Sequence, residues 1–177
     1  CSQSRGLGDV YKRQIKSFAL PKKIHGTIFS KSTSGMKYGR HIDNAYMSSG
    51  RADLSFTVFL NCKKKYEGGA LSIQGLNSEE KFKLDAGEII IYPSTYLHSV
   101  EKVIDGERLV FIGWIESYVK SIEEREYLFD LDAAARSLLA KYGRSEEVDL
   151  IYKSYSNFLR RLGNWISDLI SIILYID

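Results

Sequence analysis

His41 and Asp43 lie two residues apart and supply an imidazole and a carboxylate. In an extended segment, residues i and i+2 point to the same side, so both side chains could bind one metal ion. His98, further along the chain, is a candidate third ligand. Two imidazoles and one carboxylate on one face of a metal, with the other face open, form the arrangement that non-haem Fe(II) oxygenases use. The His-x-Asp pair alone arises often by chance, so its meaning depends on the residues around it.

Arg108, ten residues after His98, narrows the chemistry further. It begins an apolar segment and shares one alternating face with three other residues, Val110, Ile112 and Trp114. A buried guanidinium needs an anionic partner, and its planar fork suits a carboxylate. A dicarboxylate that chelates iron through its 2-oxo-acid end would present its far carboxylate to such an arginine. The alternatives are that Arg108 follows a turn into solvent, and that His98 is a buried histidine bonded to backbone.

The elements that would position these residues are short strands. Segments rich in β-branched and aromatic residues alternate with turns, at 24–29, 54–60, 70–73, 81–84, 88–92, 97–100 and 108–115. Leu54, Phe56, Val58 and Leu60 are expected on the core face of one strand, and Asp105-Gly106 is expected to form a hairpin turn. This series predicts a sandwich or a jelly roll. An immunoglobulin-like sandwich has the same strand count but gives no reason for the histidines.

Helical spacing replaces this pattern after residue 115. Ser121 and Glu124 predict a capping box at the start of one helix, with a break near Asp130–Asp132 and an end at Gly143. Ser145 is expected to cap a last helix. The fold class predicted is therefore mainly β, with C-terminal helices after a jelly-roll core.

The 177 residues suit one domain, and both ends need comment. Ser4 to Gln14 resembles the translation of a transposase-type sequencing adapter, so residues 1–14 are expected to be a non-native prefix on an N-terminally truncated domain. Without Ser4 to Gln14 the net charge falls from +3 to +1, and no nucleic-acid partner is expected. The apolar segment 165–176 is too short to span a bilayer, so a docking helix is expected and no membrane partner. Cys62 is the one cysteine outside the prefix, which fits a reducing compartment such as the cytoplasm.

Several blocks around the candidate residues carry a resemblance to a known family. They are His41-Ile42-Asp43, Ala52-Asp53-Leu54-Ser55, Tyr66-Glu67-Gly68-Gly69-Ala70-Leu71, Ile91-Tyr92-Pro93-Ser94, Leu97-His98-Ser99-Val100 and Gly106-Glu107-Arg108. Their order and spacing resemble the bacterial PKHD-type hydroxylases, a branch of the prolyl-4-hydroxylase-like Fe(II)/2-oxoglutarate dioxygenases. The resemblance covers roughly residues 24 to 162.

The resemblance implies a double-stranded β-helix (jelly-roll) domain over residues 15–115 and a helical extension over 116–177 packed on the same domain. It implies that His41, Asp43 and His98 are the catalytic Fe(II) ligands, and that Arg108 anchors 2-oxoglutarate. The implied reaction consumes O₂, hydroxylates a substrate and converts 2-oxoglutarate to succinate and CO₂, with ascorbate as the reductant. The substrate would be a peptidyl proline or a small molecule; the sequence fixes neither its identity nor the oligomeric state.

Some features of the expected pocket are specific to this chain. Lys31-Ser32 replaces an Arg-Tyr step of the family, so a hydroxyl near the co-substrate would come from another residue such as Tyr38. Three polar residues are expected to face the pocket, Ser55, Thr57 and Tyr92. The segment Asn44–Arg51 is the expected place for substrate selectivity, and His25 is expected to be structural. The alternative functions are a cupin-like metal-binding protein and an inactive binding module that does not use 2-oxoglutarate.

Overall fold

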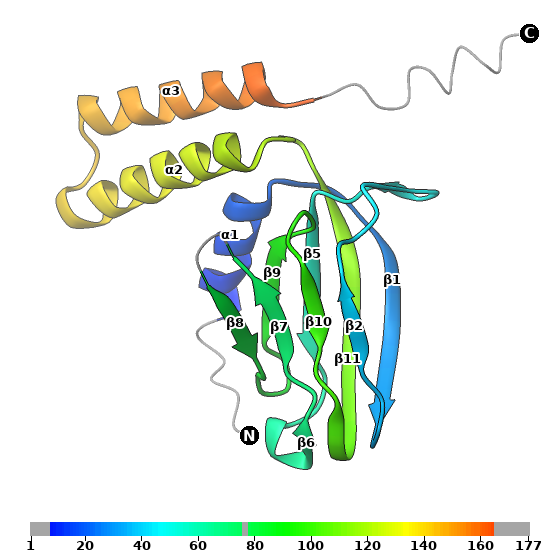
Figure 1. Cartoon of the computed structure of the whole chain (residues 1–177). Helices are drawn as coiled ribbons and strands as arrows, with labels where there is room; N and C mark the ends of the chain where they lie inside the picture. The colour runs from blue at the N-terminus through cyan, green and yellow to red at the C-terminus, as the bar shows by residue number, and fades with distance from the viewer. Residues whose placement is uncertain (1–7, 76–77, 165–177) are drawn as a thin grey trace, which may run out of the picture. The chain divides into compact units, whose positions relative to one another are not determined.

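Two compact units make up the chain in the computed structural model, which describes residues 8–75 and 78–164. One unit is built of strands and includes Pro21–Ser117. The other is helical and includes Asp9–Leu20 and the described part of Tyr118–Asp177. The strands and helices of each unit are drawn in Figure 1.

The strand unit contains two antiparallel sheets. In the larger sheet the order is β1 (Pro21–Thr33), β11 (Val103–Ser117), β5 (Leu54–Phe59) and β9 (Ile89–Pro93), and β6 (Tyr66–Gly68) also pairs with β11. In the smaller sheet the order is β2 (Tyr38–His41), β10 (His98–Val100), β7 (Leu71–Gln74) and β8 (Glu79–Phe82). A short hairpin follows β2, made of β3 (Tyr46–Met47) and β4 (Gly50–Arg51), and the 3₁₀ helix η1 (Lys63–Lys65) precedes β6.

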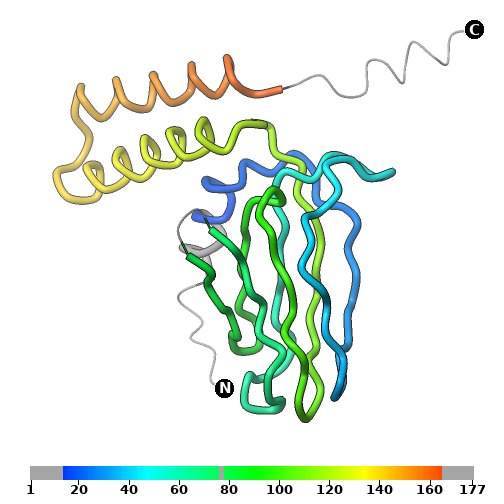
Figure 2. The backbone as a smooth tube through the Cα atoms, in the orientation of Figure 1, coloured from blue at the N-terminus to red at the C-terminus, as the bar shows by residue number. Residues whose placement is uncertain are grey.

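The chain passes back and forth between the two sheets, as the tube in Figure 2 shows. The strands β1, β5, β9 and β11 of the larger sheet alternate along the sequence with strands of the smaller one. This interleaving is the topology of a double-stranded β-helix, a jelly roll. The prediction of a mainly β fold with a jelly-roll core followed by helices is confirmed.

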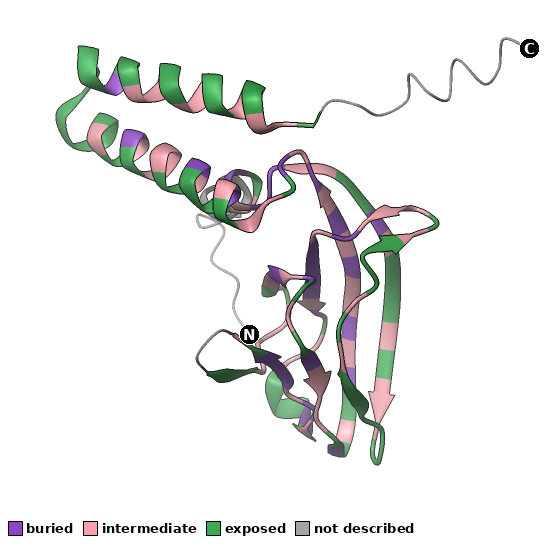
Figure 3. Ribbon diagram, turned by 45° about the horizontal axis from the view of Figure 1, so that its top comes forward, coloured by how far each residue is buried: buried purple, intermediate pink, exposed green. Residues whose placement is uncertain are grey.

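The burial of side chains differs between the strands of the larger sheet. Buried residues alternate with less buried ones along most of β11, as Figure 3 shows. In β5 both faces are covered, and the small polar residues Ser55 and Thr57 are buried along with Phe59. The prediction that Leu60 belongs to the core face is wrong, because the strand ends at Phe59 and Leu60 is 42% exposed.

Asp105 and Gly106 do not form the hairpin turn predicted for them. They lie inside β11, which continues without interruption from Val103 to Ser117. The first residues of β11 pair with β6, with a register shift between Val103 and Asp105. Gly106 has a φ of +78°, a conformation that L-residues rarely adopt. Gly106 therefore allows an irregular backbone conformation within the strand. The Asp105-Gly106 dipeptide was misleading, because bulges and turns favour the same residues.

Replacing Gly106 with alanine is expected to lower the free energy of unfolding by about 2–4 kcal/mol. A Cβ at this position would lie 2.3 Å from the Lys65 carbonyl oxygen and 2.9 Å from the Tyr66 Cα, so backbone must move. Gly35→Ala is the matched control, because Gly35 has a φ of +87° but no atom within 4 Å of an added Cβ. Denaturant unfolding should give a loss of about 1 kcal/mol for the control. Equal losses in the two variants would contradict the clash.

The helical unit consists of α1 (Gly8–Ala19), α2 (Ile122–Tyr142) and α3 (Glu146–Leu162). Ser121 caps α2 by accepting a hydrogen bond from the Glu124 backbone N–H, and Ser145 caps α3 in the same way. Gly143 ends α2 as predicted. Apolar side chains from all parts of this unit share one cluster, consisting of Leu20, Val119, Leu128, Tyr155, Leu159 and Leu162.

The structure departs from two further predictions for the helices. The break expected near Asp130–Asp132 is absent from the described chain, since α2 continues without interruption to Tyr142. Asp132 stabilises the helix there through an i,i+4 ion pair with Arg136 at 2.9 Å. Residues 8–14 of the predicted prefix belong to α1, although no periodicity predicted a helix there. That residues 1–14 are a non-native prefix stays a prediction.

The segment 165–176, predicted as a docking helix, lies outside the described residues. Within residues 8–75 and 78–164, no helix has both the length and the apolar composition that crossing a bilayer requires.

Candidate active site

His41, Asp43 and His98 meet between the ends of two neighbouring strands. His41 ends β2 and His98 begins β10, and the two residues are directly opposite each other in the antiparallel pair. Their rings are 4.2 Å apart between centroids. Asp43 follows β2 and brings its Oδ1 to 3.6 Å from Nε2 of His41 and 3.7 Å from Nε2 of His98. One possible ligand atom from each residue thus lies within 4.8 Å of the others, as a single bound ion requires.

Backbone carbonyls fix the tautomer of both histidines. Nδ1 of His41 is 2.9 Å from the Gly39 carbonyl oxygen, and Nδ1 of His98 is 3.0 Å from that of Tyr96. A carbonyl can only accept, so in each neutral ring the proton belongs on Nδ1. The lone pair is then on Nε2, which faces Asp43 in both cases. This arrangement orients both rings for metal binding through Nε2.

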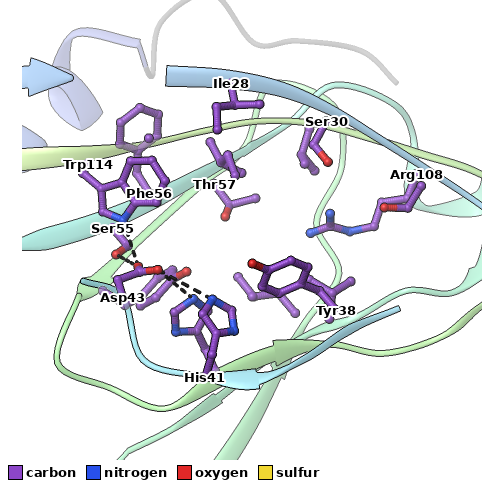
Figure 4. Close-up of a pocket in the computed structure, with 18 of the residues that line it drawn as sticks. Ile28, Ser30, Tyr38, His41, Asp43, Ser55, Phe56, Thr57, Arg108 and Trp114 are labelled. Carbon is purple, nitrogen blue, oxygen red and sulfur yellow. Dashed lines mark hydrogen bonds and ion pairs between the residues drawn. The ribbon is translucent and has the colours of Figure 1, made fainter. Parts of the chain in front are cut away.

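Two donors occupy the other oxygen of Asp43. The Trp114 indole N–H donates to Oδ2 at 2.9 Å, and the Ser55 hydroxyl donates to the same atom. Because Ser55 has one hydroxyl proton, its bond to Ser94 at 2.8 Å must run from Ser94 to Ser55. Figure 4 shows Ser55 and Trp114 on one side of Asp43 and His41 on the other. Oδ2 is therefore occupied, and Oδ1 is left to face the two imidazoles.

Removing these donors is expected to weaken metal binding without removing a ligand. In Ser55→Ala and Trp114→Phe the Asp43 carboxylate can rotate, so Fe(II) affinity should fall by about 10- to 100-fold. Anaerobic Fe(II) titration of each variant measures the change. Ser99→Ala is the control, because Ser99 follows His98 in β10 and is not among the residues that line the cavity. Wild-type affinity in both test variants would mean that Asp43 needs no help to keep its orientation.

Arg108 is buried in the same unit, with 3% of its surface exposed. Among the described residues no carboxylate pairs with it, and its Nε has no hydrogen-bond partner. Burial lowers the pKa of the guanidinium, an effect that the nearby phenols of Tyr66 and Tyr92 oppose, and the group stays charged near neutral pH. A buried cation without an anion is costly, so this position fits an anionic ligand.

One cavity of about 660 Å³ connects these groups. It lies between the sheets and is lined by residues from both, including His41, Asp43, His98 and Arg108. Figure 4 shows the Arg108 guanidinium pointing into this cavity from the side opposite Asp43. The volume is within the usual range for small-molecule sites.

The predicted pocket residues all line this cavity. They are Ser55, Thr57 and Tyr92, together with the whole predicted face of Arg108, Val110, Ile112 and Trp114. Burial, followed by the charge of Asp43, raises the pKa of the Tyr92 phenol, so Tyr92 remains a hydrogen-bond donor. Tyr38 also lines the cavity, and its ring packs edge-on against His41 at 4.5 Å with the hydroxyl directed inward (Figure 4).

His25 is separate from this cluster. It is 5% exposed, with Nδ1 2.8 Å from the Ser49 hydroxyl and Nε2 3.0 Å from the Arg51 carbonyl oxygen. Both partners belong to the segment Asn44–Arg51, so His25 anchors the hairpin that contains β3 and β4. The structural role expected for His25 agrees with these contacts.

Two partners of Asp43 were missed from the sequence. The pairing of Ser55 and Trp114 with Asp43 depends on the path of the chain after β2, which no local pattern encodes. A signal for Trp114 was present, because it shares a face with Arg108 and a partly buried indole N–H usually finds an acceptor.

Comparison with known proteins gives two family matches along the chain. Residues 27–116 match the family described as the 2OG-Fe(II) oxygenase superfamily. Residues 123–164 match the PKHD-type hydroxylase C-terminal domain.

Two relatives from Prochlorococcus marinus carry the name PKHD-type hydroxylase. A PKHD-type hydroxylase of Prochlorococcus marinus strain MIT 9215 is 79% identical over 149 residues, which cover 84% of this chain and 67% of the relative. One from strain MIT 9515 is 75% identical over 150 residues, covering 85% of this chain and 68% of the relative. Among solved structures, a Pseudomonas putida prolyl-4-hydroxylase has a TM-score of 0.49 and 24% identity, over 62% of each chain.

Proposed function

Because the chain belongs to the 2OG-Fe(II) oxygenase superfamily and to its PKHD-type hydroxylases, we propose that it is an Fe(II)- and 2-oxoglutarate-dependent dioxygenase that hydroxylates its substrate. The proposed reaction inserts one oxygen atom of O₂ into a C–H bond of the substrate. The other oxygen atom enters succinate as 2-oxoglutarate loses CO₂. The primary substrate is a peptidyl proline or a small molecule.

One observation carries this proposal: a buried arginine, with no acidic partner in residues 8–75 and 78–164, points into the cavity that also contains two histidines and an aspartate. A metal-binding protein that did not use 2-oxoglutarate would have no need for a desolvated guanidinium in this place. A dicarboxylate supplies the missing anion for Arg108 and leaves its 2-oxo-acid end for the metal.

The residues present fit both groups. His41 and His98 would hold Fe(II) through Nε2 and Asp43 through Oδ1, since their other polar atoms are already bonded. When bound, Fe(II) supplies the activation of O₂ and the oxidising power for the reaction. Arg108 would bind the far carboxylate of 2-oxoglutarate in a bidentate manner, and the apolar cavity wall would exclude water.

We propose that substrate selectivity resides in Asn44–Arg51. Asn44 and Met47 line the cavity, and His25 holds the distal part of this segment in place. The hydroxyl that the family draws from its Arg-Tyr step would come from Tyr38, whose side chain enters the cavity where Lys31 and Ser32 also lie.

The remaining proposals rest on the family. Residues 15–115 would form the dioxygenase domain and residues 116–177 its helical extension. Ascorbate would serve as the reductant that keeps the iron ferrous. A reducing compartment such as the cytoplasm would suit both Fe(II) and a thiol such as that of Cys62.

The test is succinate formation from 2-oxoglutarate by Fe(II)-loaded protein. The protein is loaded without O₂, and succinate is then measured after O₂ is admitted, with and without ascorbate. The proposal predicts succinate that depends on Fe(II) and on O₂, with more turnovers when ascorbate is present. Metal binding without any consumption of 2-oxoglutarate would overturn it and favour a cupin-like or inactive binding protein.

A further inference from the structure

A second buried polar group lies beside Arg108. Tyr66 begins β6, and 5% of its surface is exposed. Its phenol oxygen has no hydrogen-bond partner in the described part of the chain, a condition that it shares with Nε of Arg108. Burial raises the pKa of the Tyr66 phenol, and the nearby charge of Arg108 acts in the opposite direction. The Tyr66 phenol and the Arg108 guanidinium are therefore neighbours, and each has an atom without a partner among the described residues.

The surrounding backbone holds the two side chains together. Tyr66 pairs with Gly106 across the β6–β11 ladder, and Gly106 precedes Arg108 by two residues. A Cβ at Gly69 would lie 3.3 Å from both the Arg108 Cδ and the Tyr66 ring, so this glycine lets the two side chains approach each other. The Lys83 ammonium group lies over the Tyr66 ring, 4.3 Å from its centre.

Tyr66 differs from the cavity residues in one respect. Tyr92 and Arg108 line the cavity, whereas Tyr66 is not among the lining residues. Arg108 therefore borders the cavity and Tyr66 does not. Its neighbour Arg108 is the residue through which Tyr66 could act on a ligand in the cavity.

We propose that Tyr66 is a positioning residue for the co-substrate. When an anion binds, the Tyr66 hydroxyl accepts a hydrogen bond from Nε–H of Arg108. Both terminal nitrogens of Arg108 are then left for the far carboxylate. This inference rests on the proposed use of 2-oxoglutarate. Nε–H and one N–H of each terminal nitrogen then have partners. A carboxylate held by both terminal nitrogens is bound in one orientation, which aims the 2-oxo-acid end at the metal ligands.

This role makes an unusual prediction for Tyr66→Phe. Among the described residues the Tyr66 hydroxyl has no hydrogen-bond partner before the ligand binds, so its removal should leave the melting temperature unchanged or raise it. The variant should nevertheless bind 2-oxoglutarate about tenfold more weakly, because Arg108 loses the group that orients it. The KM for 2-oxoglutarate should rise by a similar factor, with kcat nearly unchanged.

Binding is measured by calorimetry on Zn(II)-loaded protein, which separates it from turnover. Two probes are compared: 2-oxoglutarate, and oxalate, which can chelate the metal but has no far carboxylate. Tyr66→Phe should weaken 2-oxoglutarate alone and leave oxalate unaffected. Tyr142→Phe, a change on the exposed surface of α2, is the control and should match the wild type for both probes.

The outcomes separate this inference from the proposed function. Wild-type binding of 2-oxoglutarate by Tyr66→Phe, with weak binding by Arg108→Ala, would overturn the role of Tyr66 and keep that of Arg108. Equal weakening of oxalate and 2-oxoglutarate, or a large fall in melting temperature, would show a general packing role instead. A wild-type protein that binds oxalate but not 2-oxoglutarate would contradict the proposed function itself.

Discussion

Replacing Arg108 with alanine is expected to raise the KM for 2-oxoglutarate by about 100-fold or more. Loss of one partner from a buried charge pair costs about 2–5 kcal/mol, and each 1.36 kcal/mol corresponds to a factor of ten. Arg108 is buried and faces the cavity, and no described carboxylate pairs with it, so the co-substrate is its expected counter-ion. Succinate formation at increasing 2-oxoglutarate concentration measures the effect.

The unfolding of the same variant gives an independent check. In the ligand-free protein Arg108 is a buried charge with no counter-ion in the part of the chain that the structure describes, so the alanine variant should lose little stability. Arg108→Lys should give an intermediate KM, because an ammonium group keeps the charge but not the bidentate fork. An alanine variant with wild-type KM would exclude Arg108 as the anchor.

Replacing Asp43 with alanine is expected to lower Fe(II) affinity by about 1,000-fold and to abolish succinate formation. Structural zinc sites with a full ligand set are worth about 10–16 kcal/mol, so one ligand of a metal site is expected to contribute several kcal/mol. The loss at Asp43 should be large, because its carboxylate supplies the negative charge of the three-ligand set. Metal content after desalting, together with anaerobic titration, measures the affinity.

His25→Gln is the control for this experiment, since His25 is a buried histidine outside the ligand set. It should keep wild-type Fe(II) affinity, although the hairpin that it anchors would loosen. Retention of one tightly bound Fe(II) by Asp43→Ala would mean that the metal is bound elsewhere.

The parts of the site that the sequence predicted depend on local periodicity. His41 and Asp43 at i and i+2 were expected to face one side, and the structure brings them together with His98. The shared face of Arg108 and Trp114 follows from the same period of two and is confirmed by the cavity lining. Caps at Ser121 and Ser145 were also predictable, because a hydroxyl before a helix binds a free N–H of its first turn.

The parts that the sequence did not predict depend on pairing between distant strands. Tyr66 lies beside Arg108 because β6 pairs with the first residues of β11. Gly106 was interpreted as part of a turn because this pairing could not be seen in the sequence. The donors to Asp43 come from two other strands, and the carbonyls that fix the histidine tautomers depend on the backbone path next to each ring. Composition and spacing limit such contacts, but they do not specify them.

The most direct test of the account is an anaerobic titration of the Fe(II)-loaded protein with 2-oxoglutarate, followed by visible absorption. Chelation of Fe(II) by a 2-oxo acid produces a charge-transfer band. The account predicts a band that saturates at one equivalent per chain in the wild type, is absent in Asp43→Ala, and needs about 100-fold more 2-oxoglutarate in Arg108→Ala. No band in the wild type, or the same titration curve in all three proteins, would contradict it.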